Sequence, residues 1–214
     1  SQRTHLMIKT ALNIRSLCIG YDRKALPLEP LNASLESGQI LCCMGENGRG
    51  KSTFFRTLCG LMPAISGEVL VHGKSLWSMT MDERSRWIAI ASTERIRLDG
   101  LTVAEVFELN PWFADHASPI PLDLVKRELL MAEIEHLPLS SLSDGQYKRV
   151  MIARCLLQQT PILLLDEPFA HLDQELEKRV QTMISTCARD YHRTILFTAH
   201  REVSFHEETQ MLEL

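Results

Sequence analysis

Gly45-Glu46-Asn47-Gly48-Arg49-Gly50-Lys51-Ser52 fits the pattern G-x-x-x-x-G-K-[ST]. The five residues before it, Ile40 to Met44, are continuously apolar, which is typical of a strand buried on both faces. Residues 51–61 after it carry apolar side chains at helical spacing, namely Phe54, Phe55, Leu58 and Leu61. The order strand, loop, helix favours a phosphate-binding loop over the alternative, a simple glycine turn before a helix.

Each residue type in this loop has a physical purpose. Glycines let backbone N–H groups turn inward around phosphate oxygens, and the following helix aims its positive end at the anion. Lys51 is expected to reach the β- and γ-phosphates, and the Ser52 hydroxyl to ligate Mg²⁺. The sequence therefore predicts an ATP and Mg²⁺ site, with nucleotide contacts from Gly45, Glu46, Asn47, Gly48, Arg49, Gly50, Lys51, Ser52 and Thr53.

A second predicted strand ends in two acids. Ile162 to Leu165 is wholly apolar, and Asp166 and Glu167 follow it directly. Asp166 is expected to share the Mg²⁺ of Ser52, and Glu167 to act on the attacking water as a general base. The alternative is a solvated acidic turn, which the upstream phosphate loop makes the weaker interpretation.

The chain alternates predicted strands and helices, which indicates a mostly parallel α/β core. Residues 101–159 are mostly helical and lie between two core strands, so they form an inserted lobe. Within this lobe, Ser143 and Asp144 are good helix N-cap residues before the segment Lys148 to Arg154. Further strands are expected at 14–21, 35–44, 68–71, 87–91, 194–199 and 211–214, and helices at 81–86 and 172–188.

Composition narrows the class of protein. The chain has 214 residues, of which 45% are hydrophobic and 23% charged, and a net charge of −4, which disfavours nucleic-acid binding through bulk charge. No apolar run approaches the roughly 18–20 residues that span a bilayer. The six cysteines form no C-x-x-C pair and are expected to be buried thiols. These features predict a cytoplasmic protein that reaches a membrane through a partner.

Taken together, the loop, the acids and Leu142-Ser143-Asp144-Gly145-Gln146 resemble the ATP-binding cassette (ABC) ATPases over nearly the whole chain. Gly45 to Ser52 resembles the Walker A loop, and Ile162 to Glu167 resembles Walker B. Residues 142–146 resemble the family signature. Three further matches are the D-loop at Ala170-His171-Leu172-Asp173, the switch histidine at His200, and the adenine-stacking aromatic at Tyr21.

The resemblance implies a fold and a mechanism. The fold is a P-loop NTPase core with a small N-terminal antiparallel β subdomain, in one domain with its core at 1–98 and 160–214 and its helical lobe at about 99–159. Two copies pair head to tail, so ATP lies between Walker A of one and the signature of the other. It implies catalytic roles for Lys51, Glu167 and His200, and nucleotide contacts from Tyr21, Ser143, Gly145, Gln146 and Asp173.

The sequence departs from the family pattern at two places. A Gln usually follows the strand that corresponds to 87–91, whereas this chain has Thr93 and Glu94 there. Glu94 is a candidate Mg²⁺ ligand, although it adds negative charge beside the phosphates, and Thr93 is the shorter alternative. The signature has Asp144 where Gly is commoner.

Within the family, the chain resembles ATPases of iron–siderophore, haem and cobalamin importers. This implies permease subunits as partners, an indirect periplasmic or lipoprotein substrate-binding protein, and a place on the inner face of the cell membrane. The alternatives are an exporter subunit, for instance of the haem-export type, and a non-transport ABC ATPase. A permease groove is expected near 93–112. Its candidate apolar walls are Leu98, Leu101, Val106, Phe107 and Trp112, and the alternative is that these residues form the lobe core.

Overall fold

The computed structural model describes residues 10–95, 100–109, 116–201, 203, 205 and 209–214. Its centre is a five-stranded sheet in the order β11-β5-β10-β9-β8, in which every neighbouring pair is parallel. The strands are β5 (Ile40–Met44), β8 (Ile88–Ala91), β9 (Ile162–Leu165), β10 (Thr194–Ala199) and β11 (Thr209–Glu213). The predicted mostly parallel α/β core is confirmed.

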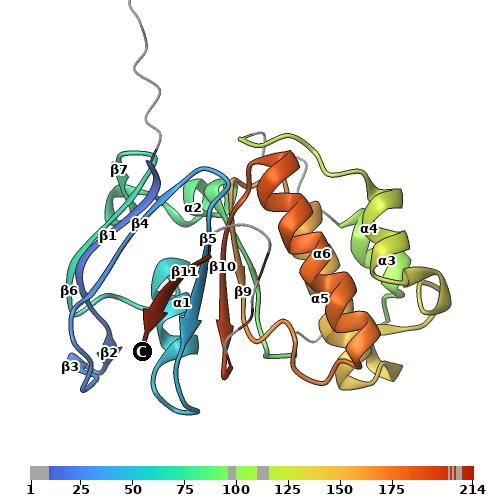
Figure 1. Cartoon of the computed structure of the whole chain (residues 1–214), viewed down its shortest axis with the longest axis horizontal. Helices are drawn as coiled ribbons and strands as arrows, with labels where there is room; N and C mark the ends of the chain where they lie inside the picture. Colours follow the sequence, from blue (N-terminus) through green and yellow to red (C-terminus); the bar gives the residue numbers. More distant parts are fainter. Residues whose placement is uncertain (1–9, 96–99, 110–115, 202, 204, 206–208) are drawn as a thin grey trace, which may run out of the picture.

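A second, antiparallel sheet packs beside the first, at the left of Figure 1. Its order is β4-β1-β6-β7, formed by β1 (Thr10–Cys18), β4 (Leu31–Glu36), β6 (Ser66–Val71) and β7 (Lys74–Ser75). A small hairpin of β2 (Gly20–Tyr21) and β3 (Lys24–Ala25) follows β1. The expected N-terminal antiparallel subdomain is therefore present.

Alternate residues of the parallel sheet face two different hydrophobic cores. In β5, Leu41 and Cys43 face the core shared with the antiparallel sheet and helix α1 (Lys51–Leu58). Ile40 and Cys42 face the opposite core, which helices α5 (Asp144–Leu157) and α6 (Gln174–Tyr191) cover. Because both faces are covered, this strand is apolar throughout, as parallel strands usually are.

The inserted lobe lies on the outer side of α5 and α6. It contains the short helices α3 (Val103–Glu108) and α4 (Leu122–Glu128). Val106 and Phe107, two candidate groove walls, are buried in a core that runs continuously from the lobe to the parallel sheet, and Leu101 packs against it. These residues are thus lobe core, while Leu98 and Trp112 lie outside the described residues. The boundaries between core and lobe, at residues 98 and 160, remain a prediction.

Several element ends differ from the predicted ones. Helix α1 ends at Leu58 rather than at residue 61, because Gly60 takes a left-handed conformation with φ of 74°. Trp87 closes helix α2 (Met81–Trp87) instead of opening β8. The single strand expected at 14–21 is divided into β1 and β2.

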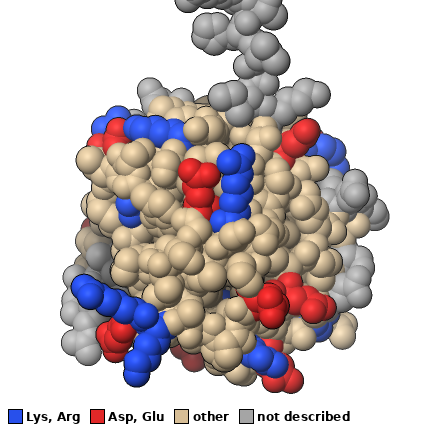
Figure 2. Space-filling model, turned by 90° about the vertical axis from the view of Figure 1, so that its left-hand side faces the viewer, with Lys and Arg blue, Asp and Glu red and all other residues tan. Residues whose placement is uncertain are grey.

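The outer face of the antiparallel sheet fills Figure 2, and positive and negative side chains are interspersed on it. Arg15 of β1 and Glu68 of β6 pair across neighbouring strands, with 3.3 Å between guanidinium and carboxylate. Among the described residues, none of the helices combines the length and the apolar character that a membrane span requires.

Candidate active site

The phosphate loop joins β5 to α1 and is built on glycines in left-handed conformations. Gly48 has φ of 80° and Gly50 has φ of 110°. A side chain on Gly50 would be strained by this φ, and its Cβ would lie 2.6 Å from a methyl carbon of Leu26, which would have to move. Among the described residues, Arg49 alone of positions 46–50 donates its N–H to a protein carbonyl, that of Glu46 at 3.3 Å. The other amides are therefore available as donors to phosphate oxygens, which fits the predicted ligand.

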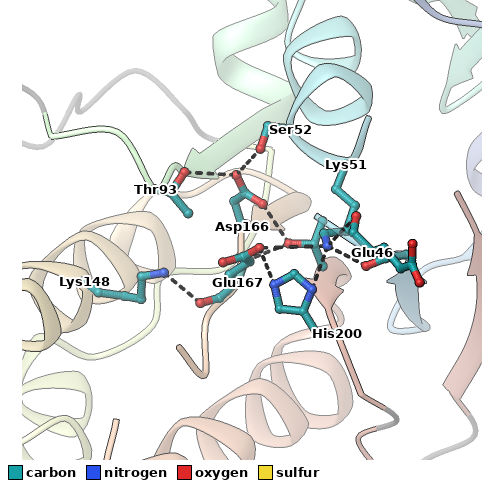
Figure 3. A network of polar contacts seen from close by, with 10 residues as sticks. Glu46, Lys51, Ser52, Thr93, Lys148, Asp166, Glu167 and His200 are labelled. Atoms are coloured by element: carbon teal, nitrogen blue, oxygen red, sulfur yellow. Dashed lines mark hydrogen bonds and ion pairs between the residues drawn. The ribbon is translucent and has the colours of Figure 1, made fainter. Parts of the chain in front are cut away.

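Lys51 is buried, with 5% of its surface exposed, and its ammonium turns back over the loop. Nζ donates to the carbonyls of Gly45 at 2.6 Å and Glu46 at 3.3 Å, and to Nδ1 of His200 at 2.9 Å (Figure 3). Burial lowers the pKa of Lys51, and the nearby carboxylates of Glu167 and Asp166 partly oppose that shift. The Lys51 ammonium is thus bonded to protein atoms, and the phosphate oxygens of a nucleotide can replace those atoms as its partners.

Asp166 gathers hydroxyl groups from three segments at the end of β9. Ser52 Oγ donates to its Oδ2 at 3.0 Å, Thr198 Oγ1 to its Oδ1 at 2.7 Å, and Thr93 Oγ1 to its Oδ2 at 3.4 Å (Figure 3). The backbone N–H of Asp166 also donates to the carbonyl of Ala91 at 2.9 Å, which fixes β9 against β8. The donor set is entirely oxygen, so it suits Mg²⁺.

Glu167 lies next to this set and faces His200. Nε2 of His200 is 2.8 Å from Oε1 of Glu167, and Lys51 Nζ is 3.9 Å from the same oxygen. Since Nδ1 of the ring accepts from Lys51, Nε2 carries the proton that the carboxylate accepts. The structure thus brings together the three residues predicted to be catalytic.

Thr93 and Glu94 are the two candidates for the position that Gln occupies in the family, and the structure distinguishes between them. Thr93 contacts Asp166, whereas the Glu94 carboxylate pairs with Arg56 and its side chain is 68% exposed. Thr93 therefore faces the site, and Glu94 faces Arg56 and solvent. Glu94, predicted as a metal ligand, is therefore not brought to the metal site, and Thr93 is.

Tyr21 lies over the other side of the phosphate loop. Its hydroxyl hydrogen bonds with Thr53 Oγ1, and its ring is half exposed. Both residues line a pocket of about 190 Å³, whose other lining residues are Leu26, Asn47, Gly48, Gly50, Lys51, Ser52 and Glu167. The pocket has the polar and aromatic lining expected for a nucleotide.

The signature residues form the start of α5. Ser143 and Gln146 make a reciprocal capping box, with backbone-to-side-chain bonds of 3.0 and 3.2 Å. Gly145 approaches the backbone of His171, where an added Cβ would lie 2.7 Å from the carbonyl oxygen. Neither Ser143 nor Gln146 lines the described pockets at the phosphate loop of the same chain.

Asp144 and Asp173 take structural partners. The Asp144 carboxylate accepts from Arg95 at 2.9 Å, and Arg95 also donates to the Leu142 carbonyl at 2.8 Å. The same guanidinium lies 4.9 Å from the ring centroid of Tyr147. Asp173, predicted to contact nucleotide, caps α6 by accepting from the N–H of Leu176 at 2.8 Å.

Sequence reasoning missed Thr198 and Lys148. Thr198 is a hydroxyl residue in an otherwise apolar strand, and it serves both acids: its hydroxyl donates to Asp166 and accepts from the N–H of Glu167 at 2.7 Å. That polar position in a buried strand was a usable signal. Lys148 donates to the carbonyl of Glu167 at 2.8 Å, and nothing in the sequence distinguished it from other lysines.

Comparison with known proteins identifies the family. A family model described as "ABC transporter" matches residues 28–170. The iron(3+)-hydroxamate import ATP-binding protein FhuC of Bacillus subtilis is 32% identical over 198 residues, which cover 89% of this chain and 73% of that protein. The thiamine import ATP-binding protein ThiQ of Escherichia coli is 32% identical over 182 residues, covering 82% and 75%.

A solved structure adds to this. It is described as an inward-facing conformation of a putative metal-chelate type ABC transporter, and it matches with a TM-score of 0.66 and 25% identity over 90% of this chain and 74% of that one. The chain therefore belongs to the ABC transporter family, as an ATP-binding subunit that hydrolyses ATP.

Proposed function

We propose that this ATPase energises import of a chelated metal, as an iron–siderophore, haem or cobalamin, through a membrane permease. The support is similarity to FhuC, a protein named for iron(3+)-hydroxamate import, and to a putative metal-chelate type transporter. The similarity to ThiQ, named for thiamine import, makes thiamine the cargo to test against.

The observation that carries the catalytic half of the proposal is the cluster of Lys51, Glu167 and His200. Lys51 exchanges its loop carbonyls for the β- and γ-phosphates of ATP. Glu167 accepts a proton from the attacking water at its carboxylate. His200 holds that carboxylate through Nε2–H, at 2.8 Å in this structure, so the base faces the phosphate loop.

Ser52 and Asp166 are proposed to hold Mg²⁺, with Thr93 beside them. A Mg²⁺ ion held by these residues would supply positive charge that offsets the negative charge developing on the phosphates during transfer. The Ser52 hydroxyl and the Asp166 carboxylate already lie 3.0 Å apart, so a cation can replace the proton that now joins them.

A second copy is proposed to complete the site. Ser143, Gly145 and Gln146 lie at a helix N-terminus that is separate from their own phosphate loop, and such an N-terminus attracts phosphate. We propose that these residues and Asp173 face the nucleotide bound by a partner copy arranged head to tail, with Tyr21 stacking on the adenine.

The permease is proposed to dock beside the loop that follows β8. A groove of about 200 Å³ lies there between α1, β8 and α5, and its lining includes Arg56, Glu94 and Leu61. Leu61 is 59% exposed, so an apolar side chain at the edge of this groove is accessible to a permease segment. The proposed place of the chain is therefore cytoplasmic, on the inner face of the membrane, with a periplasmic or lipoprotein substrate-binding protein as an indirect partner.

The test separates cargo from catalysis. Cells that lack the native gene receive either the parent chain or Glu167→Gln, and uptake of labelled ferric hydroxamate, haem, cobalamin and thiamine is measured. Restoration of one chelate by the parent alone supports the proposal. Uptake of thiamine and no chelate, or equal uptake with Glu167→Gln, contradicts it.

A further inference from the structure

Glu167 has an unusual backbone conformation for a residue at a catalytic position. Its φ is 49°, in the left-handed region, which is unfavourable for a non-glycine residue. The turn occurs directly after β9 and aims the side chain at His200. Because the conformation is unfavourable by itself, contacts from elsewhere must hold it.

Three segments supply those contacts. The N–H of Glu167 donates to Thr198 of β10 at 2.7 Å. Its carbonyl accepts from the N–H of Ala170 at 3.1 Å and from Nζ of Lys148 at 2.8 Å. Figure 3 shows Lys148 reaching the Glu167 backbone from the side opposite His200, so the residue is held at both ends.

Lys148 reaches this carbonyl from α5, the helix that Ser143 caps. Its ammonium donates to no other group among the described residues. Burial lowers its pKa, while the carboxylates of Glu167, Asp166 and Asp144 oppose that shift and favour the charged form. Lys148 is half-buried, and its ammonium gives up part of its hydration to bond one backbone carbonyl, which is unfavourable unless the position of that peptide matters.

We propose that Lys148 is a positioning residue for ATP hydrolysis. Its ammonium keeps the Glu167 peptide in the left-handed conformation from which the carboxylate faces His200 and the phosphate loop. This inference rests on the proposed role of Glu167 as the base. Loss of the ammonium lets the peptide relax toward an ordinary φ, which swings the carboxylate away and leaves the nucleotide contacts of residues 45–53 intact.

The test uses one substitution that removes the donor and one that keeps it. Lys148→Met has the same chain length up to the nitrogen and no donor, and Lys148→Arg retains donors. Lys178→Met is the matched control, because it removes the same charge from the exposed face of α6. ATP turnover at saturating Mg²⁺-ATP, KM, and the affinity for a fluorescent ATP analogue are measured with the purified full chain.

We expect Lys148→Met to lower kcat about tenfold, with KM and analogue affinity within about twofold of the parent. Lys148→Arg should recover most of kcat, and Lys178→Met should match the parent. Unchanged kcat in Lys148→Met, or equal losses in kcat and affinity that Lys148→Arg does not recover, would overturn the positioning role. If Lys148→Met does not fold, Lys148→Gln takes its place, because the glutamine amide nitrogen lies one atom nearer the backbone than Nζ of lysine. The same outcomes then support or overturn the positioning role.

Glu167→Gln is assayed in parallel so that two failures can be told apart. If its turnover equals that of the parent, the proposed base is wrong, whatever Lys148→Met does. If Glu167→Gln is inactive and Lys148→Met is fully active, the base stands and the positioning role of Lys148 is wrong.

Discussion

Nζ of Lys51 and Nδ1 of His200 lie 2.9 Å apart, so the two side chains that would face the terminal phosphate are bonded to each other. Glu167 bonds to the opposite nitrogen of the same ring. Lys51 must leave the ring to reach a phosphate, and His200 can then keep its bond to Glu167. The ring thus links the binding of ATP to the state of the base.

Replacing His200 should separate binding from hydrolysis. In His200→Ala, Lys51 loses a competing partner and Glu167 loses the donor that orients it. We expect kcat to fall by about a hundredfold or more while ATP affinity stays equal or rises slightly. Equilibrium binding of ATP and steady-state hydrolysis check this. A clear loss of affinity would show that the ring contributes to ground-state binding.

Lys51→Met should lose ATP binding without losing stability. Burial lowers the pKa of Lys51 below its ordinary 10.5, so the unfolded chain binds the proton more tightly than the folded chain does. This cost to the folded state is fully present at neutral pH and shrinks as pH rises toward 10.5. Lys51→Met should therefore be at least as stable as the parent at neutral pH, and its advantage should decline in alkali. Urea unfolding across that range tests both statements.

Thr93 and Glu94 should respond differently to the same replacement. Thr93→Gln places an amide beside Asp166, where it can contact the metal and the attacking water, so basal hydrolysis should change severalfold. Glu94→Gln weakens an outward pair with Arg56 and should leave basal hydrolysis within about twofold. Turnover is measured without permease. Equal effects from both would mean that the loop after β8 is arranged differently when nucleotide is bound.

Arg95 should matter for pairing of two copies more than for folding. The pair with Asp144 is solvent-exposed, so its loss should change stability by less than about 1 kcal/mol. An unpaired Asp144 carboxylate at the start of α5 would repel the phosphates of a partner copy. Arg95→Ala should therefore weaken the ATP-bound dimer severalfold in the Glu167→Gln background, and adding Asp144→Gly should restore it. Sedimentation in the presence of ATP measures the fraction of dimer. A dimer that stays weak in the double variant would contradict this explanation.

Arg193 should be a determinant of stability. It is fully buried and donates to the carbonyls of Thr160 and Ser118, each at 2.5 Å. Arg193→Met leaves both carbonyls without that donor and should lower the free energy of unfolding by about 1–3 kcal/mol. Arg189→Met, which alters a surface pair with Asp190, should stay within about 0.5 kcal/mol. Equal effects in chemical denaturation would contradict this assignment.

The parallel core and the phosphate loop were predictable because their signals are local. Ile162–Leu165 and Thr194–Ala199 coincide with β9 and β10, since strands buried on both faces are mostly apolar, with Thr194 and Thr198 as the polar positions of β10. The left-handed glycines of the loop and the acids at the end of β9 likewise follow from short sequence patterns.

The partners of the site residues were not predictable, because they come from distant segments. Which of Thr93 and Glu94 faces Asp166 depends on the turn after β8, and no periodic pattern fixes that turn. The contact between Lys148 and Glu167 depends on how α5 packs against β9. A single lysine in the sequence gives no indication of this tertiary contact. For Val106 and Phe107, sequence offered both a groove wall and the lobe core, and the lobe-core alternative is confirmed.

The close approach of the Gly145 and His171 backbones affects how mutations at this surface are interpreted. The two backbones approach so closely that a Cβ on Gly145 would be 2.7 Å from the His171 carbonyl oxygen, so a shift of the first turn of α5 toward the turn before α6 would push on that turn. Both belong to the surfaces proposed to face a partner copy. In the proposed dimer, this contact would be a main-chain connection between the two surfaces. Alanine scanning of the surrounding side chains would leave such a connection undetected.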